Sequence, residues 1–457
     1  LVDQLLLGGS GLSAFAGVGG TGIRLSDVNF GLAILSEQVQ QNAREWISAE
    51  ATVGSAAFDG VDGLTIEVNN MGLLINKAAA DGSVVDYSLT SGLNDGDARK
   101  SNVNIKTGPT SSIQMTMDAQ RGDFAQIYGS LVVDIFEFVQ VEGDFAITGE
   151  DANYRTKDGT EIAGSALKLG VSDANAFVGI GGADNGVGVS VRDVDLALIV
   201  FSSTQHPDSK WISVDASSQI AAFVGIDGFT LAAQDISLSI NTVSDNVHGV
   251  LDLSNEAVKT GPDSEYALST DADLGDVFRL TIGRATLAIS DYVYVSGSIF
   301  VERASSTTVN IGTGLSRALV DKNPQIKSSL AKVDGVSADY TSITDLEVSS
   351  LTIVASDVDV FVGLGPYFND TNQNGLFDAG ETRNEDAWGI DLSNIDLAVI
   401  MMDPTLAADP DNVIPNLYAV QANWNADLDI DWGLFQFQLD RLQITANQGG
   451  SWRGLSD

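Results

Sequence analysis

The sequence contains no cysteine, only two histidines and few basic residues, and each shortage narrows the classes of protein that it can represent. Without cysteine no disulfide can form, although this fact does not decide between a secreted and a cytosolic protein. The 62 acidic residues outnumber the 23 basic ones and give a formal net charge of −39. Such a chain repels nucleic-acid phosphates and anionic membrane surfaces, and it suits multivalent cations or high salt. No apolar run reaches the roughly 18 to 20 residues that a membrane-spanning helix requires.

Catalytic motifs are also lacking. The glycine-rich stretches at 17–22 and 179–186 do not have the Lys-Ser/Thr ending or the following helix of a phosphate loop, so we interpret them as hairpin turns. Neither histidine neighbours a nucleophile motif, and no G-x-S-x-G elbow is present. Carboxylates are so numerous that pairs at glycosidase-like separation must arise by chance. We therefore expect that the protein is not an enzyme.

What the chain does contain is a recurring strand pattern. In residues 187–201, Val187, Val189 and Val191 alternate with other residues, and after Asp193 the apolar set resumes at Val194 in the opposite phase. Asp and Asn tolerate unusual backbone angles, so we predict a bulge or corner at this acidic pivot. Because side chains alternate with a period of two, the change of phase predicts that the opposite face turns inward. The pattern also occurs at 23–34, 167–180, 229–240, 351–364 and 390–400.

Longer similarities divide the chain into imperfect copies. Trp46 and Trp211 lie in matching W-I-S segments 165 positions apart, and both are predicted to anchor a core. The sequence KTGP occurs at 106–109 and again at 259–262, followed each time by two strand-like segments. We delimit copy one as 1–150, copy two as 151–305 and a partial copy three as 343–457, and we expect the array to continue beyond both ends.

The copies predict an all-β protein of tandem, elongated, antiparallel sandwich-like or prism-like units, and a β-solenoid is the alternative. A β-solenoid would show one short period throughout, whereas here only the pivot recurs, at uneven spacing. Residues 306–342 interrupt the strands and are predicted to form a helical spacer. In this segment Asn323 is a suitable N-cap, Pro324 suits the first helical position, and Ile326, Leu330 and Val333 share one helical face. A second short helix is predicted over 315–321.

One segment has the spacing of a metal site. Residues 370–381 match the twelve-residue calcium loop D-x-[DN]-x-[DN]-G-x5-E at every specified position. Gly375 provides the sharp turn, and oxygen ligands at alternating positions are those that Ca²⁺ prefers. The segments before and after the loop look like strands, which excludes an EF-hand pair and predicts a stiffening clip. The predicted ligands are Asp370, Asn372, Asn374, Asp378 and Glu381 through their side chains, and Leu376 through its carbonyl.

The calcium loop, the acidity and the imperfect β copies together resemble giant repetitive bacterial surface proteins of the adhesin or calcium-binding filament kind, with a dockerin-like loop. The resemblance implies an extracellular or cell-surface structural protein that associates with itself or with neighbouring copies of the same polypeptide. It implies binding of Ca²⁺, with glycans as further candidate partners. We expect neither nucleic-acid binding nor membrane insertion.

Two other functions remain open. A carbohydrate-binding or carbohydrate-cleaving β protein would show a concave acidic cleft with exposed aromatic residues. A lipid-conducting β-groove protein would show an open groove with an apolar lining, whereas filled cores would exclude it. The repeated tryptophans and the tight glycine turns favour filled cores, and therefore the structural protein.

Overall fold

The computed structural model is built almost entirely of antiparallel β-strands, as predicted, with three short α-helices in the described part of the chain. It describes residues 2–18, 21–38, 43–88, 103–244, 249–261, 264–270, 272, 275–372, 374–378, 380–404, 413–424, 428–431, 436–439, 442–453 and 455. Two compact units are present: unit 1 comprises Leu1–Gly225 and Thr242–Ala272, and unit 2 comprises Ile226–Asn241 and Asp273–Asp457. Positions 19–20 and Pro262, which the sequence analysis placed in turns, lie outside the described residues.

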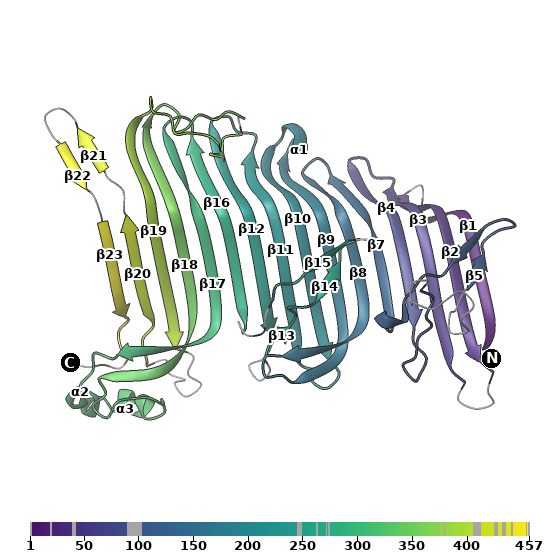
Figure 1. The fold of residues 1–457 in the computed structure, drawn as a ribbon, viewed down its shortest axis with the longest axis horizontal. Coiled ribbons are helices and arrows are strands. Elements are labelled where there is room, and N and C mark those ends of the chain that lie inside the picture. Colours follow the sequence, from purple (N-terminus) through teal and green to yellow (C-terminus); the bar gives the residue numbers. More distant parts are fainter. Residues whose placement is uncertain are drawn as a thin grey trace. The chain divides into compact units, whose positions relative to one another are not determined.

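In unit 1, consecutive long strands form an antiparallel meander (Figure 1). Its strands are β1 (Val2–Val18), β2 (Thr21–Glu37), β3 (Glu45–Asp59), β4 (Leu64–Lys77), β7 (Phe124–Ile135), β8 (Val139–Thr156), β9 (Glu161–Ile180), β10 (Val187–Ser203) and β11 (Lys210–Val224). The smaller elements are β5 (Asn104–Lys106), β6 (Ser112–Gln114), β13 (Leu251–Asp252), β14 (Ala257–Lys259), β15 (Glu265–Ala267), the 3-10 turn η1 (Ala119–Arg121) and α1 (Gly182–Asn185). β5–β6 and β14–β15 are short hairpins, and β13 pairs with β8.

Unit 2 continues the same construction. Its long strands are β12 (Phe229–Val243), whose last two residues belong to unit 1, β16 (Val277–Ile289), β17 (Val293–Gly312), β18 (Ser342–Leu364), β19 (Trp388–Pro404), β20 (Leu417–Trp424) and β23 (Leu442–Gly449). Each pairs antiparallel with the next in this order. A separate hairpin joins β21 (Leu428–Asp431) to β22 (Gln436–Leu439), and the helices are α2 (Arg317–Lys322) and α3 (Pro324–Leu330).

The acidic pivots are left-handed residues inside the long strands. Asp173, Asp193 and Asp357 have φ of 51°, and Asn394 has φ of 54°. The same conformation occurs at Asp27, Asp235 and Asp345. A non-glycine residue in this region costs roughly 1–2 kcal/mol, and Asp and Asn tolerate it best. The pairing register shifts at Asp27, Asp173, Asp193, Asp357 and Asn394, which confirms the bulges predicted there, whereas β12 pairs with β16 without a shift at Asp235.

Neighbouring pivots stabilise each other across the sheet. The backbone N–H of Asp173 donates to Asp195 Oδ1 at 3.2 Å, and the N–H of Asp193 donates to Asn175 Oδ1 at 3.2 Å. β18 and β19 repeat this exchange, from the N–H of Asp357 to Asp396 and from that of Asn394 to Asp359. The acceptor always lies two residues after a pivot. Because a bulge removes a residue from the backbone ladder, the side chain satisfies an N–H that would otherwise have no partner.

The pivots do not turn the apolar set to the opposite face, so that prediction was wrong. Val191 and Val194 of β10 pair with Ala176 and Ala174 of β9, which are two residues apart. Alternate residues of a strand share a face, and paired residues share a face, so Val191 and Val194 lie on the same side. The extra residue at the bulge absorbs the change of phase, and one face of the sheet remains apolar through the pivot.

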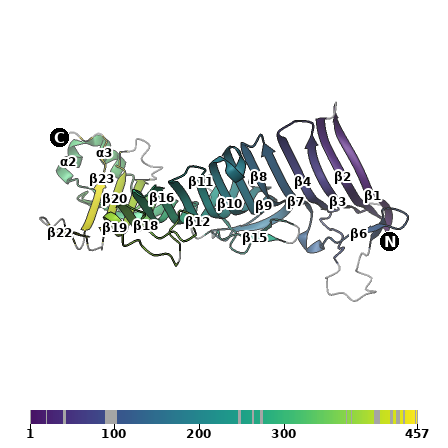
Figure 2. The same cartoon turned by 90° about the horizontal axis from the view of Figure 1, so that it is seen from above.

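We call the face of unit 1 that carries Trp46, Phe124 and Trp211 the covered face, and the opposite one the open face. The two short hairpins lie on the covered face, and Figure 2 shows β6 and β15 on the same side of the long strands. Trp46 and Trp211 are buried in two separate cores there, as predicted, and each indole N–H donates to a backbone carbonyl, of Ser83 and Gly249 respectively.

The two KTGP segments make matching contacts in these cores. The Thr107 and Thr260 hydroxyls bond to Ser111 and Ser264 across their hairpin turns, at 3.0 and 2.8 Å. In each case the preceding lysine carbonyl lies over a glycine of the sheet, Gly8 or Gly170, where a Cβ would come within 2.6 and 2.1 Å of the carbonyl oxygen. Both hairpins therefore need a glycine beneath them.

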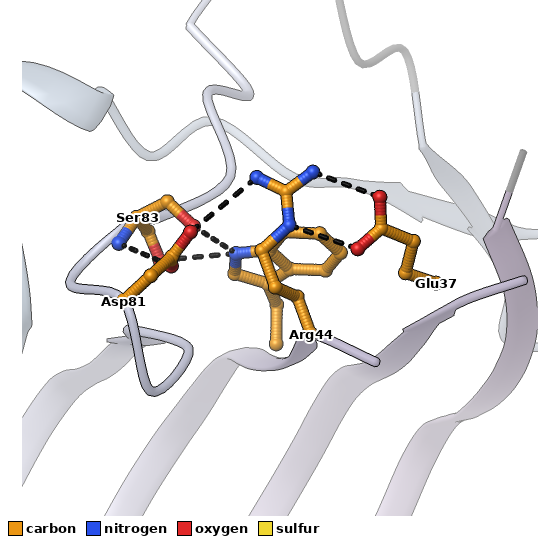
Figure 3. A network of polar contacts seen from close by, with 5 residues as sticks. Glu37, Arg44, Asp81 and Ser83 are labelled. Carbon is orange, nitrogen blue, oxygen red and sulfur yellow. Dashed lines mark hydrogen bonds and ion pairs between the residues drawn. The ribbon is translucent and has the colours of Figure 1, made fainter. Parts of the chain in front are cut away.

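An ion-pair network closes the end of the core around Trp46 (Figure 3). The Arg44 guanidinium makes two 3.0 Å hydrogen bonds to the Glu37 carboxylate and lies 3.5 Å from the Asp81 carboxylate. Asp81 in turn accepts hydrogen bonds from the backbone and hydroxyl of Ser83. The hydrogen bond from Arg44 lowers the pKa of Glu37, and the hydrogen bonds from Ser83 lower that of Asp81.

The predicted helices are present in unit 2. Asn323 occupies the N-cap position of α3 and Pro324 its first turn, as predicted, but the Asn323 side chain makes no capping hydrogen bond to α3 and donates instead to the Leu319 carbonyl of α2. α2 overlaps the second helix, which was predicted over 315–321. Ile326, Leu330 and Val333 are buried against Val348 of β18. Residues 306–312, which the sequence analysis included in the spacer, belong to β17.

The left-handed pivots lead to a direct prediction. Replacing Asp193 with glycine should change the free energy of unfolding by less than about 0.5 kcal/mol, because glycine adopts this conformation without strain. Replacing it with valine should destabilise the chain by roughly 1–2 kcal/mol, since a β-branched residue is poorly tolerated there. Urea denaturation followed by circular dichroism measures both. Equal losses for Asp193→Gly and Asp193→Val would contradict the argument.

Candidate metal centre

The predicted calcium loop lies between β18 and β19, flanked by strands as expected. Its base is closed by a bridge between Phe368 and Arg383 and by a 2.9 Å hydrogen bond from the Asn369 N–H to the Thr382 carbonyl. Positions 373 and 379 lie outside the described residues, and neither is a predicted ligand. The loop is therefore a closed excursion from a strand hairpin.

The first half of the loop wraps around the Asp370 carboxylate. Its two oxygens accept the backbone N–H groups of Asn374 and Gly375 at 3.2 and 2.8 Å. Gly375 has φ of 75°, the sharp turn that the motif requires at this position. The Asn372 and Asn374 amide oxygens accept further backbone N–H groups, from Asn374 and Leu376.

The second half returns toward the first. The Glu381 carboxylate accepts the N–H groups of Thr371 and Asp378 at 2.8 and 3.1 Å, and the Asp378 carboxylate accepts the amide groups of Asn372 and Asn374 at 3.0 and 2.6 Å. The Asn372 hydrogen bond lowers the pKa of Asp378, and the Asp378 N–H lowers that of Glu381. Both carboxylates are thus ionised at neutral pH and available to a cation.

The residues present fit a calcium ion by the chemistry of their donors. The loop brings together three carboxylates and two amides, and Leu376 is the predicted backbone-carbonyl ligand. Among the described residues no group of three or more histidine and acidic side chains is arranged to hold a metal. The predicted set differs from such a group, because two of its five side chains are asparagines.

The loop is fixed on one face of unit 2 by its apolar residues. Leu376 is 4% exposed, and the Phe377 ring packs 5.3 Å from Phe368. The Phe377 carbonyl accepts a 2.9 Å hydrogen bond from Arg284 of β16. A Cβ at Gly375 would come within 2.7 Å of the Thr230 hydroxyl on β12, so the ligand loop lies directly against the strands.

The sequence analysis missed the residues that support this loop. Arg383 pairs with Asp359 at 3.3 Å and Asp391 at 2.5 Å, and its guanidinium lies 5.1 Å from the centre of the Tyr367 ring. Burial raises the pKa of Asp391, and burial together with the nearby carboxylates raises that of Tyr367. Asp359 belongs to β18 and Asp391 to β19, whereas Tyr367 and Arg383 lie in the segment between these strands, and no local motif marks them.

Each unit also contains a cavity with acidic walls. In unit 2 a cavity of about 450 Å³ lies between the calcium loop and the strands, lined by Asp227, Asp291 and Asp370 among others. In unit 1 a cavity of about 730 Å³ is lined by residues that include Asp134 and Glu142. Apart from Phe229, whose exposure is intermediate, the aromatic residues in these walls are at 7% exposure or less. The buried rings offer no face on which a sugar could stack.

Comparisons with protein-family models, curated proteins and solved structures give no match to this chain. Among the helices of the described residues, none has the length and apolar character needed to cross a membrane.

Proposed function

We propose that this chain is a structural segment of a bacterial fibre or adhesin at the cell surface or outside the cell, stiffened by calcium and associating with neighbouring copies. The observation that carries the proposal is the calcium loop. Its carboxylates are preorganised by backbone N–H groups, and its apolar residues attach it to the strands of unit 2. A cation held there links two halves of the loop to one sheet face, which is the role of a clip.

We further propose that the strands are organised as tandem copies. The matching hairpins of unit 1, each over a sheet glycine and each beside a buried tryptophan, support this reading. Sandwich-like packing is supported by the cores between hairpins and sheet. A carbohydrate-binding role has less support, because the aromatic residues of both cavities other than Phe229 are buried.

Calcium should stabilise the chain, and the effect should depend on Glu381. At a calcium concentration 100-fold above the dissociation constant, binding to the folded state alone contributes about 2.7 kcal/mol. Glu381→Gln removes one charge and the bidentate carboxylate, so we expect at least a tenfold loss of affinity, equivalent to about 1.4 kcal/mol. Isothermal calorimetry and thermal unfolding with and without a chelator measure both quantities.

The matched control is Glu385→Gln, the same substitution at an exposed residue four positions further along the chain. It should bind calcium like the wild type. If wild type and Glu381→Gln respond identically to chelator, the calcium clip and with it the proposed function lose their support.

A further inference from the structure

The open face of unit 1 is an apolar sheet surface with nothing packed on it among the described residues. Residues that pair with one another from strand to strand form rows across this face. One row consists of Leu7, Leu32, Ala49, Ile75, Ala125, Gly149, Leu167, Val200 and Ile212, and another of Val139, Val178, Val189 and Phe223. Between these rows no described side chain on this face is charged. The net charge of the chain is −39. The charged side chains of these strands therefore lie on the covered face, or on the open face beyond the two rows.

These apolar side chains are exposed to solvent. Leu7 is 56% exposed, Leu167 52%, Val178 58% and Val189 47%, whereas Trp211 on the covered face is fully buried. Burying such side chains is worth roughly 25 cal/mol per Å² of apolar surface. An apolar patch of this extent on a soluble protein marks an interaction site.

The dimensions of the open face suit another sheet. At about 4.8 Å per strand and 3.3 Å per residue, a meander from β1 to β11 spans roughly 40 Å by 50 Å. Two such faces in contact would bury about 4,000 Å² in total, which lies in the range of obligate homodimers.

A second copy fits this face better than an acyl chain does. An acyl chain requires a narrow groove, and the cavity described in unit 1 takes its polar walls from Asp134, Gln140, Glu142 and Asn175 on the covered face. A second copy supplies a sheet of the same twist and strand length, as aligned sheet packing requires. When two open faces are joined, the charged side chains on the covered faces of both copies remain in contact with solvent.

We infer that the open face of unit 1 packs against the open face of a second copy of this chain, forming a two-fold β-sandwich interface. This inference rests on the proposed structural role and deepens it by naming the partner of the sheet. Residues on the open face become the core of the dimer, while the hairpins and the acidic residues lie outside it.

The test compares neighbouring residues of β10 that face opposite ways. Val189→Lys combined with Leu167→Lys places two charges in the interface and should weaken association by at least about 100-fold. Ser190→Lys adds one positive charge to the covered face and should leave association unchanged. Sedimentation equilibrium of the full chain over a concentration series gives the mass, and circular dichroism checks that each variant is folded.

Because the chain has no cysteine, the reactivity of a single introduced cysteine provides a second measurement. Val189→Cys should be protected from a bulky water-soluble thiol reagent in the dimer, whereas Ser190→Cys should not. A wild type that is monomeric at all concentrations, or a dimer that survives the double lysine variant, would overturn the inference. So would a monomer that binds neutral phosphatidylcholine vesicles through Val189. Calcium-dependent stability in such a monomer would leave the proposed function standing.

Discussion

Trp211→Ala should lower the free energy of unfolding by about 3–5 kcal/mol, the loss expected when a fully buried large aromatic side chain is removed. Trp211 is 0% exposed, its ring lies 5.7 Å from that of Phe201, and its indole N–H donates to the Gly249 carbonyl. Truncation leaves a cavity between sheet and hairpin and removes the hydrogen bond. Urea denaturation monitored by far-UV circular dichroism measures the loss.

Trp388→Ala is the matched control, because the same substitution is made at a residue that is 71% exposed. We expect it to change stability by less than about 0.5 kcal/mol. Two tryptophan variants of similar stability would show that the hairpin on the covered face is not a cooperative part of unit 1, and the assignment of Trp211 as a core anchor would be wrong.

Lys168→Met should destabilise the chain by about 3–5 kcal/mol, because it leaves two carboxylates partly buried without a counter-charge. The Lys168 ammonium lies 2.6 Å from both the Glu150 and the Glu256 carboxylates, and its side chain is 9% exposed. Glu150 belongs to β8, whereas Glu256 precedes β14, so the lysine joins the hairpin segment to the sheet. The same urea measurement applies.

Lys259→Met tests the contrast with a surface pair. Lys259 lies 2.8 Å from Glu265 on the outer side of the same hairpin, and both side chains are more than 40% exposed. Such a pair contributes about 0–1 kcal/mol, so its loss should scarcely be measurable. A large effect of Lys259→Met, or a small one of Lys168→Met, would contradict the assignment.

The pH dependence of Lys168 provides an independent check. Burial lowers the pKa of Lys168, but Tyr154, Glu150 and Glu256 more than reverse this effect, and its pKa ends above its ordinary value. Because the pKa of Lys168 is higher in the folded state than in the unfolded state, the ionised lysine stabilises the fold fully at pH values below the unfolded-state pKa of about 10.4. This contribution to the free energy of unfolding is lost as the pH rises through the folded-state pKa. Burial also raises the pKa of Tyr154, to about 12, with the same sign. The difference in stability between wild type and Lys168→Met should therefore shrink above about pH 10.4, and it includes the effect of the lysine on Tyr154, because Lys168 lowers the pKa of Tyr154.

Several features were predictable because their causes are local. An Asp or Asn residue in the middle of an alternating apolar strand indicated most of the pivots, although not Asp345, since few residues tolerate a left-handed backbone. The Asn-Pro pair indicated the start of α3, and Ile326, Leu330 and Val333 indicated its buried face. The candidate calcium loop could be predicted because its candidate ligands lie close together in the chain, and in the structure these side chains accept backbone N–H groups of the same loop.

The sequence by itself therefore determined the strands, most of the pivots and the tryptophan anchors, because each depends on residues close together in the chain, and it led to the prediction of the candidate calcium loop for the same reason. Only the tertiary structure decided which face of the sheet is covered. Apolar residues alternate along a strand in the same way whether their side chains face a core or solvent, so the sequence does not show which face is covered. The bulges at the pivots keep the apolar side chains of each strand on one face of the sheet. Lys168 with Glu256 and Arg383 with Asp359 likewise became visible only in three dimensions, because the pairing of strands sets which distant charges meet.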